Sequence, residues 1–152
     1  MGNEEFEVNN GTCAIVPISS KESKILGDKE YVANKSALKV LEYGCRFYGS
    51  SFAGRLEGSK FLLGSCYKLP IILEEETETV FFPTHSYRHD YCSWIALNKI
   101  KNYCKQEYDV KVEFLTGKTI VLPLSYDSFE TQIFRATKLL LALKQRKQKS
   151  RV

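Results

Sequence analysis

The chain has 152 residues, of which 43% are hydrophobic and 26% are charged, a balance that fits one globular domain with a buried core. No apolar run reaches the roughly 18 residues that a membrane span needs, and the acidic N-terminus lacks the basic-then-apolar order of a secretory signal. We therefore expect a cytoplasmic protein with no membrane partner. Its five cysteines are widely spaced and never form a C-x-x-C pair, which predicts reduced thiols that mostly serve as small core residues.

The net charge of +4 is unevenly distributed. Residues 134–152 carry seven Lys or Arg and no acidic residue, while the rest of the chain has 15 basic and 18 acidic residues. A basic end of this kind either neutralises phosphates or serves only as a solubilising terminus. We expect a single domain over residues 1–143 and a basic, flexible tail over residues 144–152.

The N-terminal half gives one clear strand and one ambiguous segment. Residues 12–18 form a β-branched run after Asn-Asn-Gly and predict a strand. Residues 19–30 are polar and turn-like, and residues 30–35 predict a second, short strand. The apolar positions of residues 38–52 fit either a helix or a strand broken at Gly44, and their periodicity does not decide.

The next segments predict antiparallel hairpins. Residues 69–84 contain two apolar runs around the acidic residues 74–78, which predicts a hairpin with a solvated turn. Residues 93–103 fit both periods, and we interpret them as a strand because the following hairpin needs a neighbour. Residues 109–124 alternate apolar and polar side chains on both sides of Thr-Gly, the pattern of a hairpin with one buried face.

A helix is expected to close the domain. Asp127 and Glu130 are placed as a variant capping box, and apolar residues follow at helical spacing up to residue 145. These residues are Phe129, Ile133, Ala136, Leu140 and Leu143. The predicted fold class is α+β, with antiparallel strands and hairpins and a C-terminal amphipathic helix packed on the sheet.

Enzyme and metal motifs are hard to find in this sequence. It has no Walker loop, no G-x-G-x-x-G and no G-x-S-x-G. His85, His89, Cys92 and Cys104 are zinc-ligand residue types, but their H-x3-H-x2-C-x11-C spacing matches no common finger. A Cys–His nucleophile pair would need a third, orienting residue, and none stands out. We expect loop histidines beside a core cysteine, no catalytic residues, no metal and no cofactor.

One short stretch, "CRFYGSSFAGR" from Cys45 to Arg55, differs from an ordinary core segment. It holds two arginines, three aromatic residues, two glycines and a Ser-Ser pair. The plain interpretation is a surface turn whose arginines pair with Glu42 and Glu57. The alternative is a contact with nucleic acid.

Five segments in order resemble the competence transcription factor family, ComK. They are "CRFYGSSFAGR", "KLPIIL", "FFPTHS", "CSWIALNKI" and "FLTGKTIVLPLSYDSFETQIFRA", and the resemblance runs from about Val8 to Thr137. It implies a cytoplasmic bacterial activator of DNA-uptake genes. It also implies binding to paired A/T-rich boxes of double-stranded DNA, mainly through the minor groove, assembly into dimers or higher oligomers, and contact with RNA polymerase.

This resemblance gives the short stretch a physical role. The minor groove of an A-tract is narrow and strongly negative, so it attracts an inserted arginine, which Arg46 or Arg55 can supply. The Ser50 and Ser51 hydroxyls can hold phosphates and fix the register. The full set of expected DNA contacts adds cations further along the chain: Arg46, Ser50, Ser51, Arg55, Lys60, Lys144, Arg146 and Lys147.

An alternative function stays open at this point. Longer family members carry a C-terminal extension with an adaptor-binding segment, and no matching segment follows "KQRKQKSRV". The body of the chain is also poorly basic for a DNA-binding protein. A shortened module that pairs with a full-length relative or a protease adaptor, without binding DNA, is therefore the second hypothesis.

Overall fold

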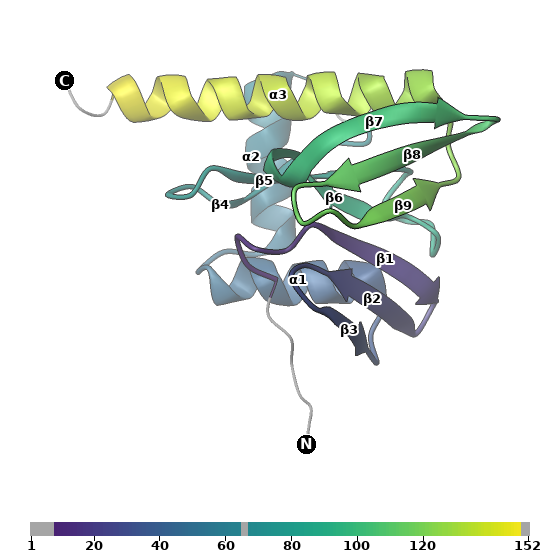
Figure 1. The fold of residues 1–152 in the computed structure, drawn as a ribbon. Helices are drawn as coiled ribbons and strands as arrows, with labels where there is room; N and C mark the ends of the chain where they lie inside the picture. The colour runs from purple at the N-terminus through teal and green to yellow at the C-terminus, as the bar shows by residue number, and fades with distance from the viewer. Residues whose placement is uncertain (1–7, 65–66, 150–152) are drawn as a thin grey trace.

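A computed structural model describes residues 8–64 and 67–149, which form two antiparallel sheets and three helices (Figure 1). The first sheet has the strand order β3-β2-β1-β6-β5-β4, and the second has the order β7-β8-β9. The strands are β1 (Ala14–Ser19), β2 (Glu22–Leu26), β3 (Glu30–Ala33), β4 (Ile71–Glu74), β5 (Thr79–Pro83), β6 (Trp94–Ala96), β7 (Ile100–Gln106), β8 (Asp109–Phe114) and β9 (Thr119–Leu122). The helices are α1 (Ala37–Phe47), α2 (Phe52–Leu63) and α3 (Tyr126–Lys149), with a 3₁₀ turn at Leu97–Lys99. The α+β class and the C-terminal helix are as expected.

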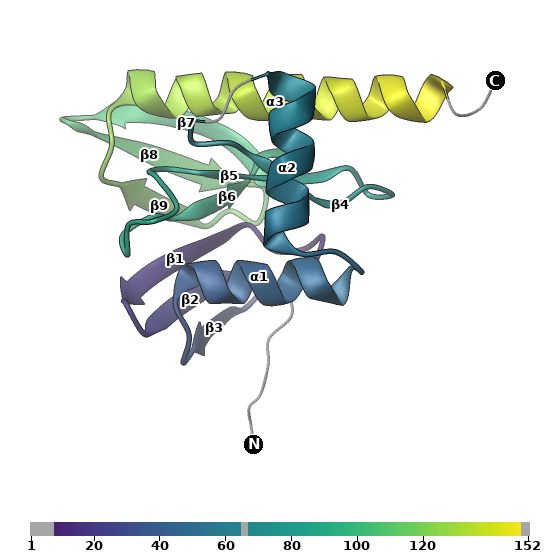
Figure 2. The same ribbon diagram turned by 180° about the vertical axis from the view of Figure 1, so that it is seen from behind.

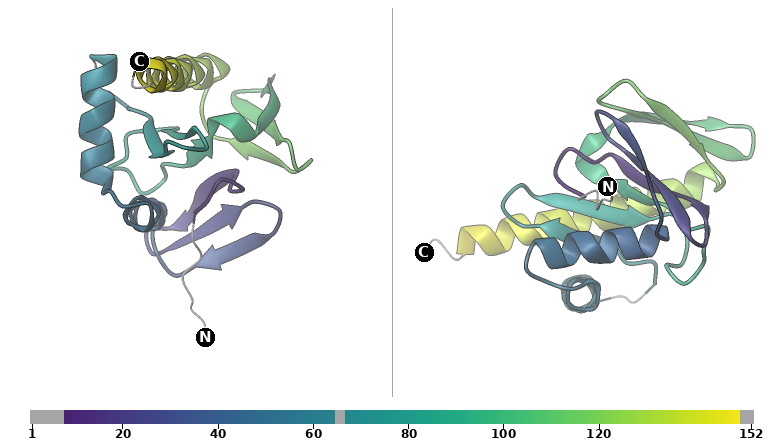
Figure 3. Two further views of the ribbon diagram at one scale, coloured as in Figure 1. Left: turned by 90° about the vertical axis from the view of Figure 1, so that its left-hand side faces the viewer. Right: turned by 90° about the horizontal axis from the view of Figure 1, so that it is seen from below.

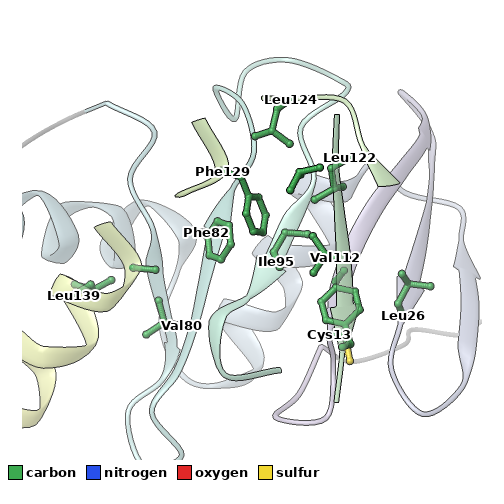
Figure 4. Packing of buried hydrophobic residues seen from close by; sticks show 14 of the residues in the cluster. Cys13, Leu26, Val80, Phe82, Ile95, Val112, Leu122, Leu124, Phe129 and Leu139 are labelled. Carbon is green, nitrogen blue, oxygen red and sulfur yellow. The ribbon is translucent and has the colours of Figure 1, made fainter. Parts of the chain in front are cut away.

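Strand β5 lies between two hydrophobic cores. Val80, Phe81 and Phe82 are completely buried, and because successive side chains of a strand point to opposite faces, they reach both sides of the sheet. Phe82 meets Phe129 of α3 edge-on, with 5.5 Å between ring centroids (Figure 4). Phe81 belongs to the other core, which α1 and the start of α2 cover. The strand thus sets the positions of all three helices.

The three helices pack against the six-stranded sheet. In Figure 2, α3 runs across the top of the molecule, α1 lies in its lower half, and α2 stands between them. No helix in the described part of the chain has the length and apolar character needed to cross a membrane.

The 109–124 hairpin is confirmed. Val110, Val112 and Phe114 are completely buried on one face of β8, and Val112 pairs with Ile120 of β9. Gly117 adopts φ +90° in the turn, a conformation that favours glycine. The 69–84 hairpin is confirmed as β4 and β5. The strand expected at 93–103 is also found, but as β6 and β7 in different sheets, separated by the 3₁₀ turn.

The polar segment 19–30 was wrongly expected to be a turn, because it contains strand β2 between β1 and β3. Ser23, Ile25 and Leu26 are all buried, with Ser23 and Ile25 on one face of the strand and Leu26 on the other. The Ser23 hydroxyl donates a hydrogen bond to the Lys35 carbonyl at 2.9 Å, so a polar residue occupies an inward position. The polar Ser23 therefore hid the alternation of apolar and polar residues that would have predicted this strand. The ambiguous segment 38–52 proves to be helical, with α2 starting at its end.

Helix α3 starts and ends differently from expectation. Its N-terminal cap is Ser125, whose Oγ accepts a hydrogen bond from the Ser128 N–H at 3.1 Å, so Asp127 lies inside the first turn instead of capping it. Glu130 faces the three-stranded sheet and accepts a hydrogen bond from the Tyr103 hydroxyl at 3.1 Å. The helix continues without a break to Lys149, so residues 144–149 are helical and not a flexible tail. Residues 150–152 lie outside the described part.

A buried glutamine of α3 joins three parts of the fold. Gln132 is completely buried, and its side-chain amide donates to the carbonyls of Lys68 at 2.9 Å and Pro83 at 2.8 Å. Arg135, one turn further on, donates to the Gln132 side-chain oxygen. The amide therefore holds the segment that precedes β4, the end of β5 and the middle of α3 together.

Replacing this amide by a hydrocarbon should destabilise the protein. We expect Gln132→Leu to lower the free energy of unfolding by about 1–3 kcal/mol, because buried carbonyls lose their donor. The exposed neighbour Thr131→Ala should stay within about 0.5 kcal/mol of the wild type. Urea unfolding measures both, and a Gln132→Leu protein as stable as the wild type would contradict the role given to the amide.

Candidate nucleic-acid interface

The stretch from Cys45 to Arg55 forms the end of α1, a tight turn and the start of α2. Gly49 adopts φ +82° in the turn, a conformation that other residues rarely accept. The Ser50 N–H donates to the Cys45 carbonyl at 2.9 Å. Arg46, in the last turn of α1, is exposed and forms no ion pair with any residue that the structure describes. The turn therefore presents an uncompensated guanidinium.

Two serine hydroxyls lie over the first turn of α2. Ser51 caps the helix, and its Oγ accepts a hydrogen bond from the Gly54 N–H at 2.9 Å. A Cβ atom at Gly54 would lie 3.1 Å from Ser51 Oγ and 3.4 Å from Ser50 Oγ, so both hydroxyls stand next to this position. A helix start with exposed hydroxyls and a small residue can accept an anion, because the helix dipole is positive at this end.

Arg55 is held by other residues. Its Nη1 lies 3.3 Å from Glu75 Oε2, and its Nη2 donates to the Leu73 carbonyl at 3.4 Å. Only 17% of the side chain is exposed. The plain interpretation named the wrong carboxylates, since Arg55 pairs with Glu75 of the β4–β5 turn and not with Glu57.

The β4–β5 connection, residues 74–78, is called the acidic turn below, and it gathers two more of the predicted contacts. Lys144 Nζ lies 3.8 Å and Lys147 Nζ lies 3.4 Å from the Glu78 carboxylate. Lys147 also donates to the Glu75 carbonyl at 3.2 Å. The side chains of these pairs are about one third to one half exposed, and ion pairs open to solvent contribute little to stability. They nevertheless place carboxylates where a phosphate would have to bind.

Three further cations lie with Lys60 on the side of α2 that faces residues 67–69 and 86–88. They were not among the predicted contacts. Lys68 and Arg135 approach the ring of Tyr67, at 5.4 and 5.7 Å from its centroid, and Arg88 lies 4.9 Å from the centroid of Tyr87. The signal in the sequence is faint: a basic residue directly follows a tyrosine at 67–68 and at 87–88. Only the fold brings these pairs together. The structure therefore divides the predicted contacts between the α1–α2 turn, the acidic turn and this aromatic cluster.

The two histidines and the four described cysteines do not form a metal centre. No group of three or more His, Cys, Asp and Glu side chains is suitably placed for a metal ion within residues 8–64 and 67–149. His89 stacks on Tyr91 with 4.9 Å between centroids, and the Cys92 thiol donates to the His85 carbonyl at 3.2 Å. Burial raises the pKa of the Cys92 thiol to about 11, so it is protonated at neutral pH and a poor nucleophile.

Two of the other cysteines fit the expected role of small core residues. Cys13 and Cys45 are completely buried, and burial raises the pKa of the Cys45 thiol to about 11. Cys104 on β7 is exposed. Cys66 lies outside the described residues.

Comparison with known proteins finds a family that covers most of the chain. The family model described as ComK protein matches residues 3–148. This chain belongs to the ComK family. The competence transcription factor of Bacillus subtilis (strain 168) is 36% identical over 137 residues, which cover 87% of this chain and 71% of that protein. No solved structure matches the chain significantly.

Neutralising the acidic turn of this ComK family member should release its cations toward a polyanion. We expect Glu75→Gln with Glu78→Gln to elute from a heparin column at higher salt than a control, because Arg55, Lys144 and Lys147 lose their carboxylate partners. The control is Glu22→Gln with Glu107→Gln, which removes the same charge from exposed positions elsewhere. Equal elution of the two double variants would show that the pairs do not restrain these cations.

Proposed function

We propose that this protein is a transcriptional activator of competence genes and acts on DNA in the cytoplasm. The observation that carries the proposal is the family match over residues 3–148, together with a relative named as a competence transcription factor. Residues 1–143 serve as one DNA-binding domain, and the end of α3 adds phosphate contacts. The protein acts without a cofactor, a metal or an enzymatic step, and RNA polymerase is its partner at the promoter.

The proposed target is a pair of A/T-rich boxes, recognised mainly through the minor groove. Arg46 supports this mode because it is exposed, lies in the last turn of α1 and has no ion pair among the described residues. Ser50 and Ser51 would hold the adjoining phosphates. Arg55 can contribute only after it leaves Glu75, and Lys144 and Lys147 only after they leave Glu78. Lys60 and Arg146 complete the proposed set.

A two-fold assembly on the paired boxes completes the proposal, since sites related by inverted sequence mirror the symmetry of a dimer. Phe134 and Leu141 support it. They lie two turns apart on the same side of α3, and 66% and 56% of their surfaces are exposed, so together they offer an apolar contact to a second copy.

The second hypothesis is a module that pairs with a full-length relative or a protease adaptor and binds no DNA. One observation favours it: the acidic turn neutralises three of the predicted contacts, Arg55, Lys144 and Lys147. A mobility shift with A/T-box DNA separates the two hypotheses directly. Absence of any shift at low salt would favour the interaction module.

The minor-groove mode makes a specific prediction. Arg46→Ala should lower the discrimination between A/T-box and G/C-rich duplex by about 1–3 kcal/mol, the size of one good specific contact. Arg55→Ala should cost less, because Arg55 is already engaged with Glu75. Lys39→Ala, near the other end of α1, is the matched control and should leave discrimination unchanged. Fluorescence anisotropy with both duplexes measures these values.

A competition experiment completes this test. A ligand that occupies A-tract minor grooves should displace the protein, whereas bulky groups in the major groove should have little effect. If the major-groove groups abolish binding and the minor-groove ligand does not, the proposed mode is wrong.

Assembly can be measured on the same DNA. We expect sedimentation to give two chains per paired box at saturation, and Phe134→Ser with Leu141→Ser to reduce this number to one at comparable protein concentration, because an apolar contact between copies is removed. Thr137→Ser, also exposed on α3, is the control. One wild-type chain per paired box would contradict the dimer.

A further inference from the structure

A groove of about 440 Å³ runs along α2, on the side of the connection between β5 and β6. Its walls come from three segments that are separate in sequence: α2, residues 67–69 and residues 86–88. The lining residues are Ala53, Leu56, Glu57, Lys60, Tyr67, Lys68, Leu69, Ser86, Tyr87 and Arg88. We call this feature the basic groove.

The charge of the basic groove is strongly unbalanced. Lys60, Lys68 and Arg88 line it, and Arg135 reaches the Tyr67 ring at its edge, against the single carboxylate of Glu57. None of these four cations forms an ion pair with a carboxylate in the described ranges 8–64 and 67–149. This differs from the acidic turn, where Glu75 and Glu78 compensate three cations. The groove can therefore bind a negatively charged ligand.

Aromatic rings contact three of these four cations. The Lys68 ammonium lies 5.4 Å and the Arg135 guanidinium 5.7 Å from the Tyr67 centroid, so two positive charges share one ring. The Arg88 guanidinium lies 4.9 Å from the Tyr87 centroid. Cation–π contacts of this kind orient a cation without neutralising it. Arginine in such a position still offers its N–H groups to a phosphate.

The backbone of the groove wall is held in an unusual conformation. Lys68 has φ +47°, a left-handed value that a residue other than glycine adopts at a cost. The buried amide of Gln132 donates to its carbonyl at 2.9 Å and thereby pins the conformation from inside. Such strain persists where the surrounding structure enforces it, and it is common at binding sites. Here it directs the lysine beside Tyr67.

We propose that the basic groove binds phosphate groups of the DNA backbone, through Lys60, Lys68, Arg88 and Arg135. This inference rests on the proposed function. It adds a contact surface along α2 that is separate from Arg46, which lies in the last turn of α1. Backbone contacts position a protein on the duplex and carry no sequence information. The groove thus provides affinity and register, while the α1–α2 turn reads the A/T boxes.

The test removes two groove charges and compares salt dependence. In Lys68→Gln with Arg88→Gln, the slope of log affinity against log salt should fall by about 0.9 for each phosphate that the protein no longer neutralises. Affinity for A/T-box and G/C-rich duplex should fall by similar factors, so the preference survives. The control, Lys105→Gln with Lys111→Gln, changes the same charge on the three-stranded sheet, which lies on the opposite side of the molecule from α2 (Figure 3).

The outcomes separate this inference from the proposed function. A wild type without preference for A/T boxes counts against the proposed function, and the slopes on G/C-rich duplex still test the groove. Unchanged slopes in the groove variant, or equal losses in the control, would overturn the groove. Arg88→Glu alone, at an exposed position, is the second variant and should weaken duplex binding more than Arg88→Gln does.

Free phosphorylated molecules are the other source of the same chemistry. Tripolyphosphate should compete with duplex only weakly, at millimolar concentration, and equally for both sequences. Tight binding of tripolyphosphate that the groove variant loses, while its duplex affinity stays at the wild-type value, would assign the groove to a small ligand and overturn the contact with DNA.

Discussion

The burial of β5 on both faces is the constraint on which the rest of the molecule depends. Phe81 and Phe82 point to opposite sides of the sheet, and each is completely buried. Helix α3 and the three-stranded sheet therefore pack on one face, while α1 and the start of α2 cover the other. This arrangement fixes the two ends of the strand. The acidic turn at its start lies beside α3, and the β5–β6 connection at its end faces α2. Both charged features of the surface follow from one buried strand.

The cations near these two features fall into two groups: those that pair with a carboxylate, and those without such a partner among the described residues. The acidic turn holds Lys144 and Lys147 through partly exposed ion pairs, which phosphate can displace because such pairs are weak. The Arg55–Glu75 pair is more buried, since only 17% of the Arg55 side chain is exposed. The basic groove and Arg46 are not compensated in this way within the described residues. The body of the chain is near neutral in total, yet one side of α2 is positive. Net charge therefore does not indicate where the surface of this fold is positive, and the position of each carboxylate matters more.

The sequence predicts the fold best where periodicity and turn residues agree. The hairpin around Gly117 and the apolar side of α3 are such cases, and both are confirmed. Strand β2 was missed because Ser23 occupies an inward position, satisfied by a carbonyl twelve residues away. The cap of α3 was misplaced because Asp127 and Ser125 are both plausible caps, and only the backbone decides between them.

The candidate site was harder to predict, because ion pairs are tertiary features. The sequence places Arg55 near Glu57, but helix geometry and the β4–β5 turn bring Glu75 to it. The pairing of Tyr67 with Arg135 spans 68 positions and depends on the Gln132 amide between them. Neither could be inferred from local spacing. The turn at Cys45–Arg55 was identified because its residue types are unusual in themselves, whatever the fold around them.

Amide hydrogen exchange, measured with and without paired A/T-box duplex, tests the central claim most directly. The claim is that DNA lies along α2, between the α1–α2 turn and the basic groove. The expected result is slower exchange on DNA binding at residues 50–54, 67–69 and 86–88, with the exposed strands β7 and β9 unchanged. Slower exchange confined to β7–β9, with no change along α2, would contradict the claim.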